Sequence, residues 1–169
     1  MLKEPTRRIR FLTHEEASSL LATLPKHLAD MAAFSLATGL RRANVTGLQW
    51  TQLDLVRRLA WIHPDQAKAR KAIAVPLSAE AVLILRRQVG KHPTRVFSFR
   101  GKPIRQVSTK AWYQALKRAG IQDFRWHDLR HTWASWHGRT ERRVSHCRRW
   151  AAGTDRRWCG AMRTYRRIT

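Results

Sequence analysis

The sequence RWHDLRHTWAS at residues 125–135 decides how the rest of the chain is interpreted. His127 and Arg130 are three residues apart, so in a helix their imidazole and guanidinium groups share a face and can reach one ligand. The apolar residues of the same stretch recur near the helical period: Leu129, Trp133 and Trp136. This pattern predicts a half-buried helix with a polar edge. An amphipathic helix with scattered charges and no ligand would produce the same stretch.

A second motif, TGLRR at residues 38–42, lies far upstream. Thr-Gly-x-Arg followed at a distance by His-x-x-Arg-His resembles the catalytic domain of tyrosine recombinases, the phage integrase family. The resemblance runs from about Arg10 to Trp136. It implies an α+β fold, mainly α-helical with a small antiparallel β-sheet. It also implies integration and recombination of double-stranded DNA by strand cleavage and rejoining, carried out by multimers with no cofactor.

The charge of the chain favours a polyanionic partner. Lys and Arg number 34 against 11 Asp and Glu, a net charge of +23. Such an excess points to nucleic acid, whose binding would weaken steeply with salt as phosphate contacts release counterions. A basic surface without a dedicated partner is the alternative. A general RNA-binding protein is a further alternative, but no usual base-stacking motif is present.

The composition also restricts the fold class and the compartment. A chain of 169 residues with 43% hydrophobic residues is expected to form one domain with its own core. No apolar run approaches the roughly 18 residues of a membrane span, and no signal peptide is recognisable, which predicts a cytoplasmic protein. Cys147 and Cys159, even with His146, match no zinc-ligand spacing, so no metal is expected.

Local signals predict the order of the elements. Thr13 and Glu16 form a capping box at the start of a helix that Pro25 ends, and Gly39 is expected to cap the next helix. Helices are predicted at 13–24, 27–38, 44–48, 78–89 and 106–118, before the helix of the first motif, and strands at 59–63, 72–77 and 96–99. We expect a basic lead-in at 1–10, an incomplete integrase-type domain at 11–137 and an arginine-rich tail at 138–169.

The resemblance assigns candidate roles around a DNA phosphate. Arg41 and Arg130 correspond to the two phosphate-clamping arginines of the family, and guanidinium groups suit phosphate because they donate two parallel hydrogen bonds. Arg42 competes with Arg41 for the first position. His127 corresponds to the histidine that contacts the phosphate and assists proton transfer, although a surface histidine at a helix start would look the same. His131 is expected to serve packing or a supporting hydrogen bond.

Lys68 lies in the basic turn between the two predicted strands. The resemblance assigns it the hairpin lysine that protonates the leaving 5′ oxygen, while a solvated lysine is the alternative. Its neighbours share the cationic character, so residue type alone does not single it out. The candidate DNA-binding residues beyond the catalytic set are Arg42, Arg70, Lys71 and Arg125, with Arg41 belonging to both sets.

The resemblance fails in the last 32 residues, 138–169. Family members carry a Leu-Gly-His or Gly-Gly-Trp segment and then the nucleophilic tyrosine, and neither is recognisable there. Codons for residues 157–165 can be chosen so that a neighbouring frame reads Met-Val-Arg-Arg-Tyr-Ala-His-Leu. The same frame over residues 146–153 can yield Leu-Gln-Glu-Val-Gly-Gly-Trp, which indicates a frameshift just after His137.

Tyr165 is the one tyrosine of this region in the present frame. With a frameshift, the lost tyrosine codon would straddle Ala161 and Met162, and Tyr165 would be a coincidence. A displaced but working nucleophile is the alternative. The resemblance begins close to residue 1, so we also expect no helical DNA-binding domain of the kind that usually precedes the catalytic domain. We therefore expect a recombinase-type domain that lacks its nucleophile and is inactive in cleavage, with a non-catalytic DNA-binding remnant as the alternative description.

Overall fold

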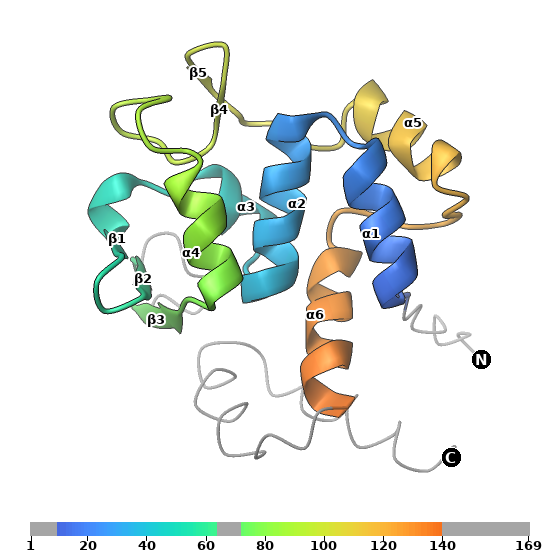
Figure 1. Cartoon of the computed structure of the whole chain (residues 1–169), viewed down its shortest axis with the longest axis horizontal. Coiled ribbons are helices and arrows are strands. Elements are labelled where there is room, and N and C mark those ends of the chain that lie inside the picture. The colour runs from blue at the N-terminus through green and yellow to red at the C-terminus, as the bar shows by residue number, and fades with distance from the viewer. Residues whose placement is uncertain (1–9, 64–71, 140–169) are drawn as a thin grey trace, which may run out of the picture.

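Helix α2 (Lys26–Thr38) occupies the centre of the fold. The computed structural model describes residues 10–63 and 72–139 of the chain. Three longer helices pack against α2: α1 (His14–Thr23), α4 (Ala79–Arg86) and α6 (Asp128–Arg139), as Figure 1 shows. Small antiparallel sheets lie beside this helical body, so the predicted class, a mainly α-helical α+β fold, is confirmed.

The first two helices begin and end at the predicted signals. Thr13 Oγ1 accepts the backbone N–H of Glu16 at 3.1 Å, and Glu16 Oε2 accepts that of Thr13 at 2.9 Å. Burial raises the pKa of Glu16, but the Thr13 N–H and the Arg10 guanidinium outweigh it and leave the pKa lowered. Helix α2 ends at Gly39, whose φ of +64° is the left-handed conformation that glycine adopts most easily.

A three-stranded antiparallel sheet in the order β1–β2–β3 follows. The strands are β1 (Leu53–Asp54), β2 (Leu59–Ile62) and β3 (Ile73–Pro76), which confirms the two predicted strands and adds β1. Ala60 pairs with Val75 and Ile62 with Ile73. Ala60 and Ile62 are fully buried while Trp61 between them is exposed, so one face of the sheet covers the core. The segment that joins β2 to β3 lies outside the described residues.

Three predicted boundaries are corrected. The short helix predicted at 44–48 is α3 (Arg42–Thr46), two residues earlier. The strand predicted at 96–99 shrinks to β4 (Ser98–Phe99), which pairs with an unpredicted β5 (Lys102–Pro103). The helix predicted from residue 106 is α5 (Lys110–Arg118), since Val107 is buried as part of the preceding irregular segment.

Helix α4 also ends earlier than predicted. It begins after Ser78, whose hydroxyl accepts the N–H of Ala81 at 3.2 Å, and its last residue is Arg86 rather than Val89. Val89 lies in the turn that follows and is 61% exposed. Val89 therefore has the spacing of a helical residue without belonging to the buried face of α4.

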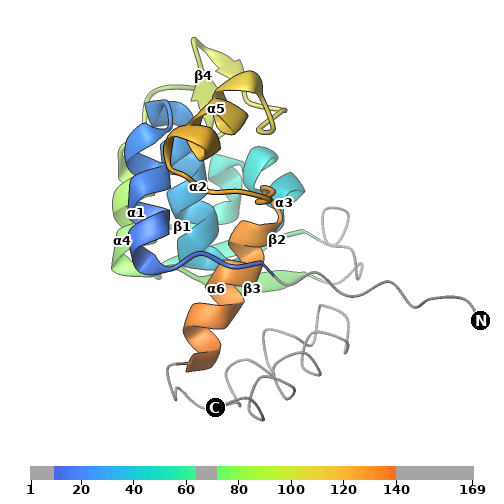
Figure 2. The same ribbon diagram turned by 90° about the vertical axis from the view of Figure 1, so that its right-hand side faces the viewer.

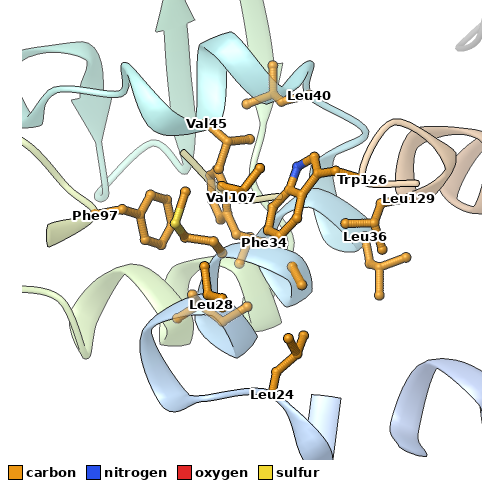
Figure 3. Packing of buried hydrophobic residues seen from close by; sticks show 14 of the residues in the cluster. Leu24, Leu28, Phe34, Leu36, Leu40, Val45, Phe97, Val107, Trp126 and Leu129 are labelled. Atoms are coloured by element: carbon orange, nitrogen blue, oxygen red, sulfur yellow. The ribbon is translucent and has the colours of Figure 1, made fainter. Parts of the chain in front are cut away.

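The core joins α2 to the start of α6 (Figure 3). Phe34 of α2 lies with its ring centroid 5.4 Å from that of Phe97. Trp126 and Leu129 come from the other end of the chain and are buried in the same cluster. Trp112 of α5 packs on Trp126 with ring centroids 4.8 Å apart. These contacts fix the position at which α6 starts relative to α2.

Over residues 10–63 and 72–139, no helix is both long enough and apolar enough to cross a membrane.

Candidate functional site

The end of α2 positions Arg41. Thr38 is buried, and its hydroxyl donates to the carbonyl of Phe34 at 2.7 Å, which holds the last turn of the helix. Gly39 then reverses the chain, and Leu40 inserts into the core. Arg41 is the residue that precedes α3, and its carbonyl accepts the N–H of Val45 at 3.1 Å. Its half-buried side chain therefore projects from a fixed backbone between two helices.

The start of α6 positions His127 and Arg130. The helix begins at Asp128, one residue later than His127, which corrects the expectation that both lie inside a helix. The turn before the helix nevertheless keeps the two residues together, because the N–H of Arg130 donates to the carbonyl of His127 at 3.1 Å. The Asp128 carboxylate accepts the N–H of Arg125 at 2.8 Å and closes the same turn.

Thr132 ties this turn to the beginning of the described chain. Its hydroxyl is fully buried, donates to the carbonyl of Asp128 at 2.8 Å and accepts the N–H of Leu12 at 3.1 Å. Buried hydrogen bonds of this kind are costly to break. The first turn of α6 is therefore held on two sides, by the core and by the segment before α1.

Arg130 reaches across to the end of α2. Its Nη1 donates to the carbonyl oxygen of Gly39 at 2.5 Å, a contact between residues 91 positions apart. Burial, and the positive charge of Arg41 after it, lower the pKa of Arg130 to about 10. The guanidinium remains charged at neutral pH, and Arg41 is near enough for its charge to act on Arg130 by repulsion. An anion between them would relieve this repulsion.

His127 lies in the same positive surroundings. Burial and the charge of Arg130 lower the pKa of its imidazole, with further contributions from Arg41 and Arg42, against an opposing effect of Asp128. The free protein therefore favours the neutral imidazole near pH 7. Figure 2 shows α3, which carries Arg42, close to the end of α6 at which His127 lies.

His131 is placed beside His127. The ring centroids are 5.3 Å apart and the ring planes meet at 80°. Burial and then His127 lower the pKa of His131; Asp128 opposes and Arg130 adds to this effect. The two imidazoles thus disfavour being protonated together.

The structure brings together four of the residues singled out from the sequence: Arg41, Arg42, His127 and Arg130. Arg125 is exposed two residues before His127, at the edge of the group. The remaining candidates lie outside the described residues: Lys68, Arg70, Lys71 and Tyr165. One contributor was not singled out as a site residue, the carbonyl of Gly39, which accepts a hydrogen bond from Arg130. The Thr-Gly-x-Arg motif contains it.

Two guanidinium groups and an imidazole suit the binding of a phosphate. Within residues 10–63 and 72–139, the ion pairs found join Arg10 to Glu16, Arg57 to Asp54, and Arg87 to Asp30. Arg41 and Arg42 are in none of them. Cations held near one another are typical of sites for anions, because a bound anion removes their mutual repulsion.

Comparison with known proteins yields one family. The sequence profile of the phage integrase family matches residues 10–142. The integrase of Salmonella phage P22 is 44% identical over an alignment of 143 residues, and the match covers 77% of this chain and 37% of that protein. The chain thus spans little more than a third of the length of this relative.

Two solved structures share the fold. A lambda integrase dimer bound to a COC′ core site has a TM-score of 0.73 at 18% identity, covering 98% of this chain and 51% of that one. The catalytic domain of bacteriophage HP1 integrase has a TM-score of 0.67 at 22% identity, covering 92% of this chain and 86% of that one. At these identities the likeness establishes the architecture.

Proposed function

Since the chain belongs to the phage integrase family, we propose that it binds duplex DNA through a domain of the tyrosine-recombinase type. In this proposal one phosphodiester group sits between Arg41, His127 and Arg130. The observation that carries the proposal is the meeting of two distant segments at one cationic group, with Arg130 bonded to the carbonyl of Gly39. The net charge of +23 supports a polyanionic partner independently.

Each proposed residue has a chemical task. Arg41 and Arg130 bind the non-bridging oxygens and neutralise the charge that develops when phosphorus is attacked. His127 donates a hydrogen bond to the same phosphate and takes up a proton as the anion binds, because the anion offsets its positive neighbours. Lys68, in the segment of the sequence that joins β2 to β3, is the proposed proton donor to the leaving 5′ oxygen. Arg42 and Arg125, both exposed, extend the contact along the DNA backbone.

The same proposal holds that this chain binds DNA without cleaving it. Cleavage and rejoining need a nucleophile in line with the bound phosphorus, and clamping alone forms no covalent intermediate. Tyr165 would need its hydroxyl within about 3–3.5 Å of the phosphorus. Its surroundings at 157–169 contain four arginines and too few apolar residues to bury a helix, so they offer little to hold it beside a group of cations. Residues 138–169 are accordingly proposed to be a frameshifted tail and 11–137 the domain.

Other properties of the proposal follow from the family. The protein is proposed to act in the cytoplasm, where DNA is accessible, and to assemble in multimers on it. The related lambda integrase was solved as a dimer bound to its core site. The proposed domain needs no metal or cofactor, because two arginines supply the positive charge at the phosphate.

The test combines DNA binding with the trapping of an adduct. Since the target site is unknown, the full chain is incubated with nicked suicide duplexes of randomised sequence, which retain any protein–DNA adduct. We expect binding that is tight at low salt, falls by orders of magnitude as salt rises and shows little sequence preference, with no adduct. An adduct that disappears in Tyr165→Phe would show that the chain is an active enzyme with Tyr165 as its nucleophile. A lack of binding at low salt would refute the DNA-binding proposal itself.

A further inference from the structure

Trp133 covers the left-handed turn at Gly39. A Cβ atom built on Gly39 would lie 2.3–2.9 Å from three atoms of the Trp133 ring. Side-chain atoms essentially never approach so closely, so the indole occupies the space that any larger residue 39 would need. Trp133 is three residues after Arg130 in α6, and Gly39 is the residue that ends α2. The contact therefore joins the two helices.

Arg130 holds the other side of the same residue. Its Nη1 binds the carbonyl oxygen of Gly39, and it lies three positions before Trp133, so both side chains leave the same face of α6. Gly39 is therefore fixed by a hydrogen bond and by a ring on one helix face. Arg41 is only two residues after Gly39, and the turn at Gly39 sets the course of the backbone that leads to it. The position of Arg41 therefore depends on that of Gly39.

We propose that Trp133 is a positioning residue for the phosphate clamp, which sets the separation between Arg41 and Arg130 by holding Gly39 against α6. The inference rests on the proposed function and names a residue that acts through others, since Trp133 itself need not touch DNA. Without the ring, the end of α2 can move away from α6. Repulsion between the two cations favours that movement when no phosphate is bound.

Trp136 offers a matched control on the same helix. It is also a half-buried tryptophan, and its Nε1 donates to the carbonyl of Leu12 at 3.0 Å while its ring stacks on His14 with centroids 4.1 Å apart. These contacts lead to the start of α1 and not to Gly39. Removal of either indole deletes a half-buried aromatic ring from α6, but only the Trp133 ring lies against Gly39.

The experiment follows inorganic phosphate binding through the imidazole NMR signals of His127 in the full chain. We expect Trp133→Ala to weaken phosphate binding at His127 by about tenfold or more, because displacements of about 1 Å in such sites have effects of this size or larger. Trp136→Ala should stay within about twofold of the wild type, and Trp133→Phe should recover part of the affinity because its ring can still cover Gly39. Affinity for duplex DNA at low salt, which many other cations share, should change much less.

The outcomes separate the inference from the proposed function. Equal losses in the two alanine variants, or no loss in Trp133→Ala, would overturn the positioning role. If His127 in the wild type does not respond to phosphate at all, the proposed function fails as well. Trp133→Leu is measured in parallel, because it keeps apolar volume without a flat ring and so preserves the comparison if Trp133→Ala does not fold.

Discussion

Replacement of Gly39 by alanine should lower the free energy of unfolding by about 2–5 kcal/mol. A left-handed conformation costs a residue with a Cβ about 1–2 kcal/mol. Overpacking a filled space costs about 1–3 kcal/mol more, and here the new methyl group meets the Trp133 ring. Since a whole domain is stable by only about 5–15 kcal/mol, the loss should be a large fraction of the total stability. Urea denaturation followed by tryptophan fluorescence measures the loss.

Gly120→Ala is the matched control for this change. Gly120 has a φ of +68°, nearly that of Gly39 at +64°, but no atom lies within 4 Å of a Cβ built on it. It should therefore show the backbone cost alone, about 1–2 kcal/mol. If the two variants lose the same stability, the Trp133 ring does not constrain residue 39 as described.

Arg130→Ala should reduce the affinity of the site for phosphate by about 100-fold or more. The variant loses up to two charge-assisted hydrogen bonds to the anion, each contributing about 1.5–3 kcal/mol. It also leaves the carbonyl of Gly39 without its donor from Arg130. Phosphate titration read at His127 gives the affinity. Binding to long duplex DNA should weaken only modestly, since other cations still hold the backbone.

Two further variants locate the effect of Arg130. Arg130→Lys keeps the charge, but an ammonium group cannot bind Gly39 and present a planar pair of donors to phosphate, so most of the loss should remain. Arg42→Ala removes an exposed cation at the first position of α3 and should cost only a few-fold in phosphate affinity. A loss in Arg42→Ala as large as that in Arg41→Ala would mean that the first arginine of the clamp is wrongly assigned.

Much of the helical framework could be predicted because its signals are local. The capping box of Thr13 and Glu16 and the glycine at 39 each act within one helical turn, and the structure contains both. The pair β2 and β3 was recognisable from two apolar runs on either side of a basic segment of the sequence. Short elements were missed: β1 and β5 contain two residues each, too few for any periodicity.

The start of α5 could not be predicted because tertiary packing decides it. Val107 has the spacing of a helical residue, yet it is buried in the irregular segment before the helix. The helix begins only at Lys110, after Thr109, whose backbone N–H is already bonded to the carbonyl of Val107 at 3.0 Å. The periodicity of apolar residues in this segment does not reveal that Val107 is buried outside a helix.

The candidate site shows the same division. The spacing of His127 and Arg130 implied a shared face, and a backbone bond across the turn before α6 keeps them together. The approach of Arg130 to Gly39 and of Trp133 to the same residue depends on how α6 packs on α2, which no local pattern encodes. The motifs identified Gly39 and Arg130 separately, and only the packing of α6 on α2 brings the two residues into contact.

The most direct measurement of the central claim is the pKa of His127 with and without duplex DNA, followed by NMR at low salt. In the free protein, burial and the charge of Arg130 lower this pKa from its ordinary value near 6.5. A phosphate held between Arg41, His127 and Arg130 favours the imidazolium, so the pKa should rise by about one unit or more on binding, and DNA affinity should increase as pH falls through this range. In Arg130→Ala the pKa of the free protein should be higher than in the wild type, and the rise on DNA binding should be much smaller. A His127 pKa that stays unchanged while DNA saturates the protein would contradict the account.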